Sequence, residues 1–241
     1  METSQAIFKI GGNILENRQH LTATVSQLTS LYERNTLNKI IIIAGGGSYA
    51  NLIRLLDQKV HIGDDLSHWM AIYSMDINGK KISRYFPRVK RTKNLEDIEK
   101  ANRILTVFLP YKYLHQYDPL PHSWDITSDS ITLFLAYKLK LKECYLIKNV
   151  DGIYKLKDEI IKSLTSDDFV RFKNSGQIAI LKSKESAIKS TKPIDFYLPK
   201  LINKYQINCV ILNGLSSNLR ILKYFRLDND QNKVYTKITY I

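Results

Sequence analysis

The chain has 241 residues, enough for one large domain with a sizeable core, and its 44% hydrophobic and 24% charged residues are ordinary for a globular protein. Its apolar runs are much shorter than the roughly 20 residues of a membrane-spanning helix and no signal-peptide pattern opens the sequence, so we expect a cytoplasmic protein with no membrane partner. The formal net charge of +13 is compatible with anionic ligands or nucleic acid, whereas two isolated cysteines fit neither a disulfide scaffold nor a zinc site.

The first half of the chain alternates between strand and helix patterns. Short apolar runs, typical of buried strands, lie at residues 6–10, 39–44 and 104–109. Helices are predicted over residues 14–31, 49–58, 64–77 and 95–101. The prediction rests on the spacing of apolar residues and on residues at the segment starts that are typical of helix caps. We expect a short strand pair over residues 82–89 and a loop or broken helix over residues 111–122.

The second half repeats this alternation. Helices are expected over residues 127–141, 194–205 and 216–225, and strands over residues 143–148, 208–212 and 234–241. A turn is predicted at residues 149–154, and the lysine-rich residues 155–192 give no clear pattern. Strands that alternate with helices predict a mostly parallel sheet covered on both faces, an α/β three-layer αβα sandwich. With no visible linker or repeat, we expect a single domain over residues 1–241.

The densest basic segment spans residues 80–93 and contains two aromatic residues, Tyr85 and Phe86. Basic and aromatic side chains together can form a groove for single-stranded nucleic acid. Most charge runs are solvated surface, however, and the other lysines are scattered along the chain. We therefore interpret the segment as a solvated edge hairpin and do not expect nucleic acid as a partner.

Three motifs follow predicted strands, and the first is formed by residues 8–13. Gly11 and Gly12 end the first strand, where glycines let backbone N–H groups approach an anion closely. Lys9 lies just before them in a buried strand, so its ammonium group needs a partner or a cavity. The alternative is a tight strand-to-helix turn with a lysine that reaches solvent.

The second motif is the run Gly45, Gly46 and Gly47 after the second strand. Three consecutive glycines are conformationally costly and exceed what a tight turn needs, which indicates close approach of a ligand to the backbone. Arg54 lies about two turns into the following helix and is a candidate for binding an anionic substrate group. A surface arginine is the alternative.

The third motif is Thr127, Ser128 and Asp129, at the start of a helix. Hydroxyls and carboxylates cap the free N–H groups of a first turn, and the same N-terminus attracts anions such as phosphate. An ordinary capping cluster is the alternative. Because ligands of parallel sheets bind beyond the carboxyl ends of the strands, we expect the three motifs to meet at one edge of the sheet.

Several phosphate-binding signatures are missing from the sequence: the Gly-x-x-x-x-Gly-Lys-Ser/Thr loop, the Gly-x-Gly-x-x-Gly fingerprint and the protein-kinase motifs. The three motifs in their order, followed by Lys-Asn-Val-Asp-Gly-Ile-Tyr at residues 148–154, instead resemble the amino-acid kinase family, which includes acetylglutamate, aspartate, uridylate and isopentenyl phosphate kinases. Residues 45–54, 67–72 and 120–125 resemble in particular its archaeal branch with the aminomethylfuran-methanol phosphate kinase of methanofuran synthesis.

The resemblance implies roles for individual residues. The implied catalytic residues are Lys9, Asp129 and a second lysine, Lys192, with Lys189 and Lys200 as alternatives. The residues implied to bind the nucleotide are Gly11, Gly12, Asn13, Thr127, Ser128, Lys148, Asp151, Gly152 and Tyr154. Those implied to bind the acceptor are Gly45, Gly46, Gly47, Arg54 and His68. The implied cofactors are ATP and Mg²⁺ with no protein metal ligand assigned, and homo-oligomers are common in the family.

The implied reaction transfers the γ-phosphoryl group of ATP from a nucleotide-binding half, residues 126–241, to a small anionic acceptor on residues 1–125. The sequence offers no evident general base, and a phosphate or carboxylate oxygen needs none because it is already ionised at neutral pH. The resemblance favours aminomethylfuran-methanol phosphate as the acceptor. The alternatives are a kinase of isopentenyl phosphate, of a nucleoside monophosphate or of an amino acid through an acyl phosphate.

Departures from the family pattern leave a non-catalytic ligand-binding relative as a further alternative. Asn13 stands where the family usually has serine, and no lysine-bearing family segment is recognisable in residues 155–192. The alternative for His68 is a half-buried histidine with satisfied hydrogen bonds.

Overall fold

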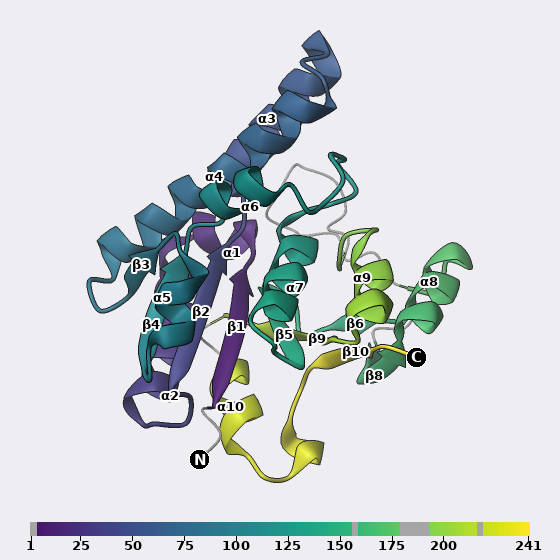
Figure 1. Ribbon diagram of the computed structural model, residues 1–241. Coiled ribbons are helices and arrows are strands. Elements are labelled where there is room, and N and C mark those ends of the chain that lie inside the picture. Colours follow the sequence, from purple (N-terminus) through teal and green to yellow (C-terminus); the bar gives the residue numbers. More distant parts are fainter. Residues whose placement is uncertain (1–3, 156–158, 179–192, 216–218) are drawn as a thin grey trace.

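One sheet of eight strands runs through the described part of the chain, which comprises residues 4–155, 159–178, 193–215 and 219–241 of a computed structural model (Figure 1). Its strand order is β3-β4-β2-β1-β5-β9-β10-β8. The strands are β1 Gln5–Ile10, β2 Lys39–Ala44, β3 Lys90–Thr92, β4 Ile104–Phe108, β5 Glu143–Lys148, β8 Ser163–Thr165, β9 Asn208–Asn213 and β10 Thr236–Thr239. All neighbouring strands in this sheet are parallel except β9 and β10.

The central strands β1 and β2 are apolar on both sides because helices cover both faces of the sheet. Ile7 packs into one hydrophobic cluster and Phe8 into the other, and Ile41 and Ile42 divide in the same way. This partition follows from the alternation of side chains along a strand. Lys9 belongs to the same series as Ile7, so its side chain extends on the face that carries the cluster of Ile7.

Helices form the two outer layers and confirm the predicted α/β sandwich. Their bounds are α1 Gly12–Glu16, α2 Arg18–Glu33, α3 Gly47–Val60, α4 Asp64–Tyr85, α5 Leu95–Lys100, α6 Tyr111–Tyr117, α7 Ser128–Lys138, α8 Ser166–Asn174, α9 Leu198–Tyr205 and α10 Arg220–Arg226. Buried residues of α1, α2 and α10 pack with Phe8, whereas those of α7 and α9 pack with Ile7. The helix α7 therefore covers the face of β1 on which Lys9 lies.

Two predicted elements are wrong in the first half of the chain. The helix expected over residues 14–31 is two helices, because the side chain of Asn17 accepts hydrogen bonds from the N–H groups of Gln19 and His20 and starts α2 there. The strand pair expected over residues 82–89 is absent, because α4 continues to Tyr85 and Ile82 packs in the core. The basic segment is thus a helix end followed by the edge strand β3, not a hairpin.

The second half contains short elements that the sequence pattern did not indicate. A two-stranded sheet of β6 Ile153–Tyr154 and β7 Ile160–Ile161 follows β5, and β8 leads into α8 through a capping box of Thr165 and Asp168. The helix expected from residue 194 begins at Leu198, and the one expected over 216–225 is described from Arg220. Residues 179–192 lie outside the described part of the chain.

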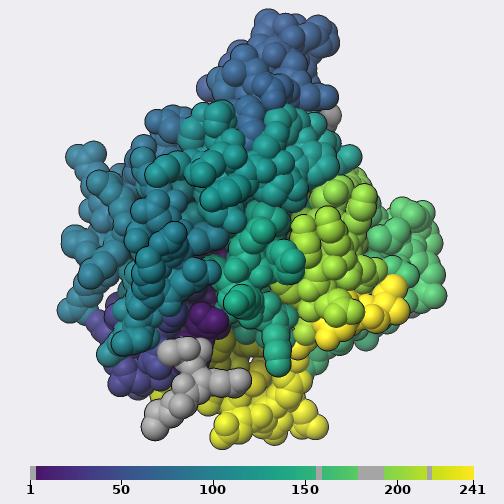
Figure 2. All heavy atoms as spheres, viewed as in Figure 1, coloured from purple at the N-terminus to yellow at the C-terminus, as the bar shows by residue number. Residues whose placement is uncertain are grey.

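The helix α3 and the adjoining part of α4 project from the body of the molecule (Figures 1 and 2). Leu52, Leu56 and Val60 on α3 are 55%, 39% and 63% exposed. They follow one another at intervals of four residues and therefore share one face of the helix. Within the described residues, no helix has the length and apolar character needed to cross a membrane.

Candidate active site

The two glycine turns meet at the carboxyl ends of β1 and β2. The N–H group of Gly45 donates to the carbonyl of Ile10 at 2.9 Å, so the second turn begins against the end of the first strand. A methyl group added to Gly12 would lie 2.9 Å from the Cα atom of Gly47, and Gly47 has a φ angle of +58°. Only glycine accommodates both this backbone approach and this conformation. The predicted convergence of residues 9–12 and 45–47 is therefore observed.

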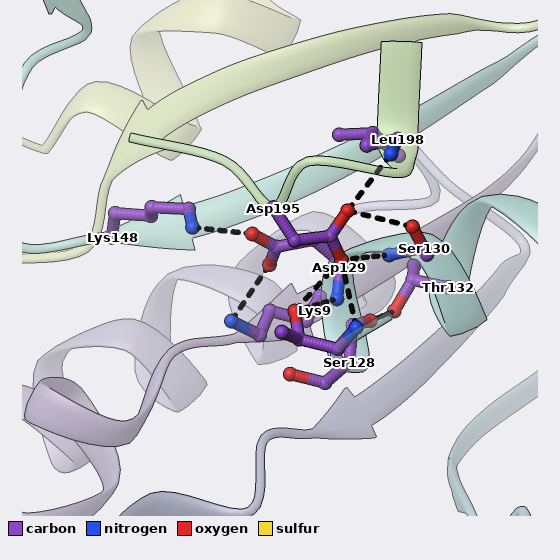
Figure 3. Close-up of polar contacts among 9 residues, drawn as sticks. Lys9, Ser128, Asp129, Ser130, Thr132, Lys148, Asp195 and Leu198 are labelled. Carbon is purple, nitrogen blue, oxygen red and sulfur yellow. Dashed lines mark hydrogen bonds and ion pairs between the residues drawn. The ribbon is translucent and has the colours of Figure 1, made fainter. Parts of the chain in front are cut away.

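A buried carboxylate lies between two lysines (Figure 3). One of them, Lys9, adjoins Gly11 and Gly45 of the two turns. One oxygen of Asp129, in the first turn of α7, is 2.8 Å from the Nζ atom of Lys9, and its other oxygen is 2.7 Å from that of Lys148. Lys9 comes from β1 and Lys148 from the end of β5, which pair in parallel, so adjacent strands deliver both ammonium groups to one helix start. The third predicted motif thus joins the first two.

The charges of this cluster shift the pKa of Asp129 to about 2. Burial alone would raise the pKa of that carboxyl, but the ammonium groups of Lys148 and Lys9 outweigh it. Burial lowers the pKa of Lys9, and the ion pair with Asp129 opposes this change. The carboxylate therefore stays ionised at neutral pH and holds two cations at the rim of the glycine turns.

Asp195, which the sequence patterns did not single out, fixes the start of α7. Its carboxylate accepts hydrogen bonds from the N–H and hydroxyl of Thr127 at 2.9 and 2.8 Å and from the N–H and hydroxyl of Ser130 at 3.0 and 2.7 Å. It also accepts from the N–H of Leu198, the first residue of α9, at 2.8 Å. A local signal for this residue was available in the sequence. Asp195 lies three residues before the first residue of α9, and the second residue of that helix is a proline.

Asn78 is a second residue that the patterns missed. It lies on α4, is 5% exposed, and donates from its amide nitrogen to the carbonyls of Gly45 and Gly46 at 2.8 and 2.9 Å. Helix α4 therefore holds the carbonyl side of the second glycine turn. The contact joins residues more than 30 positions apart, so no local sequence pattern reveals it.

Comparison with known proteins places this geometry in a family. The model of the amino acid kinase family matches residues 5–213, a span that contains both glycine turns and all three members of the ion-pair cluster. The chain belongs to the amino acid kinase family. It is accordingly a kinase, a phosphotransferase.

Individual relatives cover nearly the whole chain. It is 28% identical over 234 residues to [5-(aminomethyl)furan-3-yl]methyl phosphate kinase of Methanocaldococcus jannaschii, with 96% of each chain covered. The crystal structure of the UMP kinase from Ureaplasma parvum has a TM-score of 0.67 at 16% identity and covers 99% of this chain and 100% of its own. That of the uridylate kinase from Archaeoglobus fulgidus has a TM-score of 0.63 at 17% identity, covering 97% and 99%. These structural likenesses show the fold.

In this member of the amino acid kinase family, the residues expected near the nucleotide lie around the ends of β5 and β9. Asp151 accepts a hydrogen bond from Arg220 at 2.9 Å and one from Asn213 at 3.2 Å. Gly152 packs against Thr236, whose hydroxyl accepts from the N–H of Ile153 at 2.8 Å. Tyr154 follows in β6. Asn13 is the exception, because it lies exposed on α1 after β1.

The residues expected at the acceptor form two aromatic contacts on α3 and α4. The guanidinium of Arg54 lies 4.6 Å from the ring centre of Trp124, whose indole N–H donates to Asp57 at 2.7 Å. The buried ring of His68 stacks on His122 at 4.2 Å between centres. Burial and the neighbouring His122 lower the pKa of His68 to about 4, so its imidazole is neutral at pH 7.

The three candidates for the second catalytic lysine take no part in the described contacts of Asp129. Lys192 and Lys189 lie outside the described residues, and Lys200 is exposed on α9 beside the ring of Tyr197. In the described ranges, Lys148 is the second lysine that contacts Asp129. The resemblance implied that Lys148 binds the nucleotide. In the structure its Nζ atom lies as close to Asp129 as that of Lys9 does.

Proposed function

We propose that this kinase transfers the γ-phosphoryl group of ATP to the phosphate group of a small acceptor and forms a diphosphate. The observation that carries the proposal is the pair of ammonium groups, Lys9 and Lys148, held by buried Asp129 beside two glycine turns. The acceptor we favour is [5-(aminomethyl)furan-3-yl]methyl phosphate, because the relative that is 28% identical over nearly the full chain bears that name.

The reaction in this proposal needs no proton transfer. An ionised oxygen of the acceptor phosphate attacks the γ-phosphorus, the bond from that phosphorus to the β,γ-bridging oxygen breaks, and ADP leaves with the electron pair. Both reactants are anions, so their approach and the charge on the transferring oxygens must be neutralised. Lys9 and Lys148 supply two fixed positive charges, and Asp129 keeps them in place by ion pairs of 2.8 and 2.7 Å.

Mg²⁺ would accompany the phosphates of ATP and add charge neutralisation when bound. The described residues contain no group of three or more histidine, cysteine, aspartate or glutamate side chains suited to hold a metal ion. The carboxylate of Asp129 is occupied by lysines and that of Asp195 by backbone and hydroxyl donors. In kinase sites Mg²⁺ usually keeps several waters and binds substrate phosphates. We propose the same arrangement here, with Gly11, Gly12, Ser128 and Asp151 on the nucleotide side.

The acceptor would lie on the half formed by residues 1–125, and ATP on residues 126–241. Arg54 supports this assignment, because its Nε atom is buried and has no hydrogen-bond partner among the described residues. A buried guanidinium nitrogen without an acceptor is costly, and an anionic substrate group would satisfy it once the Arg54 side chain turns to expose this nitrogen. The neutral ring of His68 can donate or accept a hydrogen bond but adds no charge to the acceptor site.

The test is phosphoryl transfer from ATP and Mg²⁺ to a panel of acceptors, followed by phosphorus NMR of the products. The panel contains the aminomethylfuran phosphate, isopentenyl phosphate, UMP, acetylglutamate and aspartate. A new diphosphate signal with the furan compound at the highest kcat/KM supports the proposal. A higher kcat/KM with another acceptor would assign that acceptor as the substrate instead. ATP binding without turnover of any acceptor would favour a non-catalytic relative.

We further propose that a second copy of this chain covers the apolar face of α3. Leu52, Leu56 and Val60 form a stripe on a projecting helix, and Leu66 at the start of α4 is 53% exposed. A stripe on one helix is self-complementary about a twofold axis, the commonest symmetry of homo-oligomers. Because α3 begins at Gly47, the dimer contact would support the helix that carries the second glycine turn.

A further inference from the structure

The side-chain amide of Asn78 uses its two hydrogens on consecutive carbonyl groups of the second glycine turn. The oxygens of Gly45 and Gly46 lie 2.8 and 2.9 Å from its nitrogen, and the side chain is almost fully buried. Two carbonyl oxygens require a donor, so the amide cannot be turned by 180° in this site. Asn78 is therefore locked in one orientation by the turn that it contacts.

This contact fixes the direction of the next N–H groups. In a trans peptide unit the carbonyl and the N–H point in opposite directions. The carbonyls of Gly45 and Gly46 point at Asn78, so the N–H groups of Gly46 and Gly47 point away from α4. Lys9 and Gly12 border the turn: the Cε atom of Lys9 is 3.3 Å from a methyl group placed on Gly45, and the Cα atom of Gly12 is 3.9 Å from one placed on Gly47.

The N–H groups of Gly46 and Gly47 find no backbone acceptor among the described residues. They precede and open a helix of 14 residues, α3, so its dipole adds partial positive charge to them. The ammonium of Lys9 is in the same neighbourhood. Two aligned donors and a cation would suit the oxygens of a phosphoryl group in transfer.

We propose that Asn78 is a positioning residue for phosphoryl transfer: it turns two peptide units of the second glycine turn so that both N–H groups donate to the transferring phosphoryl group. The inference rests on the proposed function. Asn78 itself does not contact substrate, because α4 lies behind the turn. Replacing Asn78 should therefore change kcat more than the affinity for ATP, because the first glycine turn and the second half of the chain would bind most of the nucleotide.

The test compares Asn78→Leu and Asn78→Asp with Ile82→Ala. Leucine removes both donors, and aspartate keeps the shape but presents an acceptor to two carbonyl oxygens. Ile82 lies one turn further along α4 and packs in the core, so its truncation weakens the same helix without touching the turn. We expect kcat to fall by about 10²-fold in both Asn78 variants, as for loss of an oxyanion-hole donor, with the dissociation constant of an ATP analogue changed by less than about threefold.

If Asn78 had a structural role alone, Asn78→Leu and Ile82→Ala would lose the same kcat for the same fall in melting temperature. That result would overturn the inference. A readout without turnover separates it from the proposed function. In amide NMR spectra, the N–H signals of Gly46 and Gly47 should shift on addition of pyrophosphate to the parent and stay unshifted in Asn78→Leu. No shift in the parent rejects the role of Asn78, whether or not the parent turns over any acceptor. A shift without turnover rejects only the proposed function.

Discussion

Two buried lysines, Lys9 and Lys39, have the same exposure of 7% but different kinds of partner, a carboxylate for Lys9 and backbone carbonyls for Lys39. Lys39 donates to the carbonyls of Ile98 and Glu99, both at 3.0 Å, and so caps the end of α5. Lys9 pairs with a carboxylate that a second lysine already neutralises. The first arrangement serves the fold, and the second leaves a cation available to an anionic ligand.

We predict that Lys9→Met lowers kcat by about 10²-fold or more, because it removes a charge from the transferring phosphoryl group. The melting temperature should change little, since Asp129 keeps its ion pair with Lys148. Lys39→Met is the matched control and should lower the free energy of unfolding by about 1–3 kcal/mol with kcat unchanged. Steady-state kinetics and thermal unfolding of both variants provide the check, and equal kcat for Lys9→Met and the parent would reject the role of Lys9.

The stacked pair of His68 and His122 predicts a pH dependence of stability. Burial, and after it the neighbouring His122, lowers the pKa of His68 from 6.5 to about 4, whereas Asp118 and Asp65 act in the opposite direction. The unfolded chain therefore binds the proton more readily, so stability is complete above pH 6.5 and falls as the pH drops toward 4, by roughly 2–3 kcal/mol.

His68→Gln should flatten this dependence between pH 6.5 and 4.5, as measured by urea unfolding at a series of pH values. The control is His61→Asn, since His61 is exposed in a left-handed conformation that asparagine tolerates. A parent whose stability does not change across this range would contradict the account of His68.

Among the elements, α7 depends on a residue distant in sequence. Asp195 accepts five hydrogen bonds that tie the first turn of α7 to the start of α9. Asp195→Ala leaves buried donors without an acceptor, so we predict a loss of about 3 kcal/mol or more in the free energy of unfolding. Chemical denaturation measures it, with the exposed Asp228→Ala as a control expected to be unchanged. A loss below about 1 kcal/mol would show that water replaces this acceptor.

Elements with strong local signals were predictable from the sequence, and those fixed by tertiary contacts were not. The strand over residues 39–44 matches β2 because its apolar run and the glycines after it define both ends. By contrast, α4 extends through polar residues to Tyr85 because Asn78 and Ile82 are buried against other elements. The break at Asn17 had a local cap signal, but the apolar spacing on either side concealed it.

For the assembled chain, the projecting apolar face of α3 predicts a homo-oligomer. Leu56→Asp places a charge in the middle of the stripe and should convert the protein to monomers. Val170→Asp is the control, because Val170 on α8 is 41% exposed and lies outside the stripe. Size-exclusion chromatography with light scattering gives the masses, and a parent that is monomeric at micromolar concentration would contradict the second-copy contact.

The long-range convergence of the site was predictable because the parallel sheet brings strand ends to one edge. Lys9, Gly45 and Asp129 meet there, as the places of their motifs after predicted strands indicated. The supports behind them, Asn78 and Asp195, were not predictable, because each acts through contacts with no fixed spacing in sequence. The roles that the resemblance assigns to the site residues, Lys9 and Asp129 as well as Arg54 and His68, stay predictions.

A crystal structure with a non-hydrolysable ATP analogue and Mg²⁺ tests the site directly. The account predicts that the γ-phosphate lies between the two glycine turns, within hydrogen-bond distance of Lys9, and that the nucleoside extends toward Asp151 and Gly152. An analogue bound with its γ-phosphate away from Lys9 and both glycine turns would contradict it.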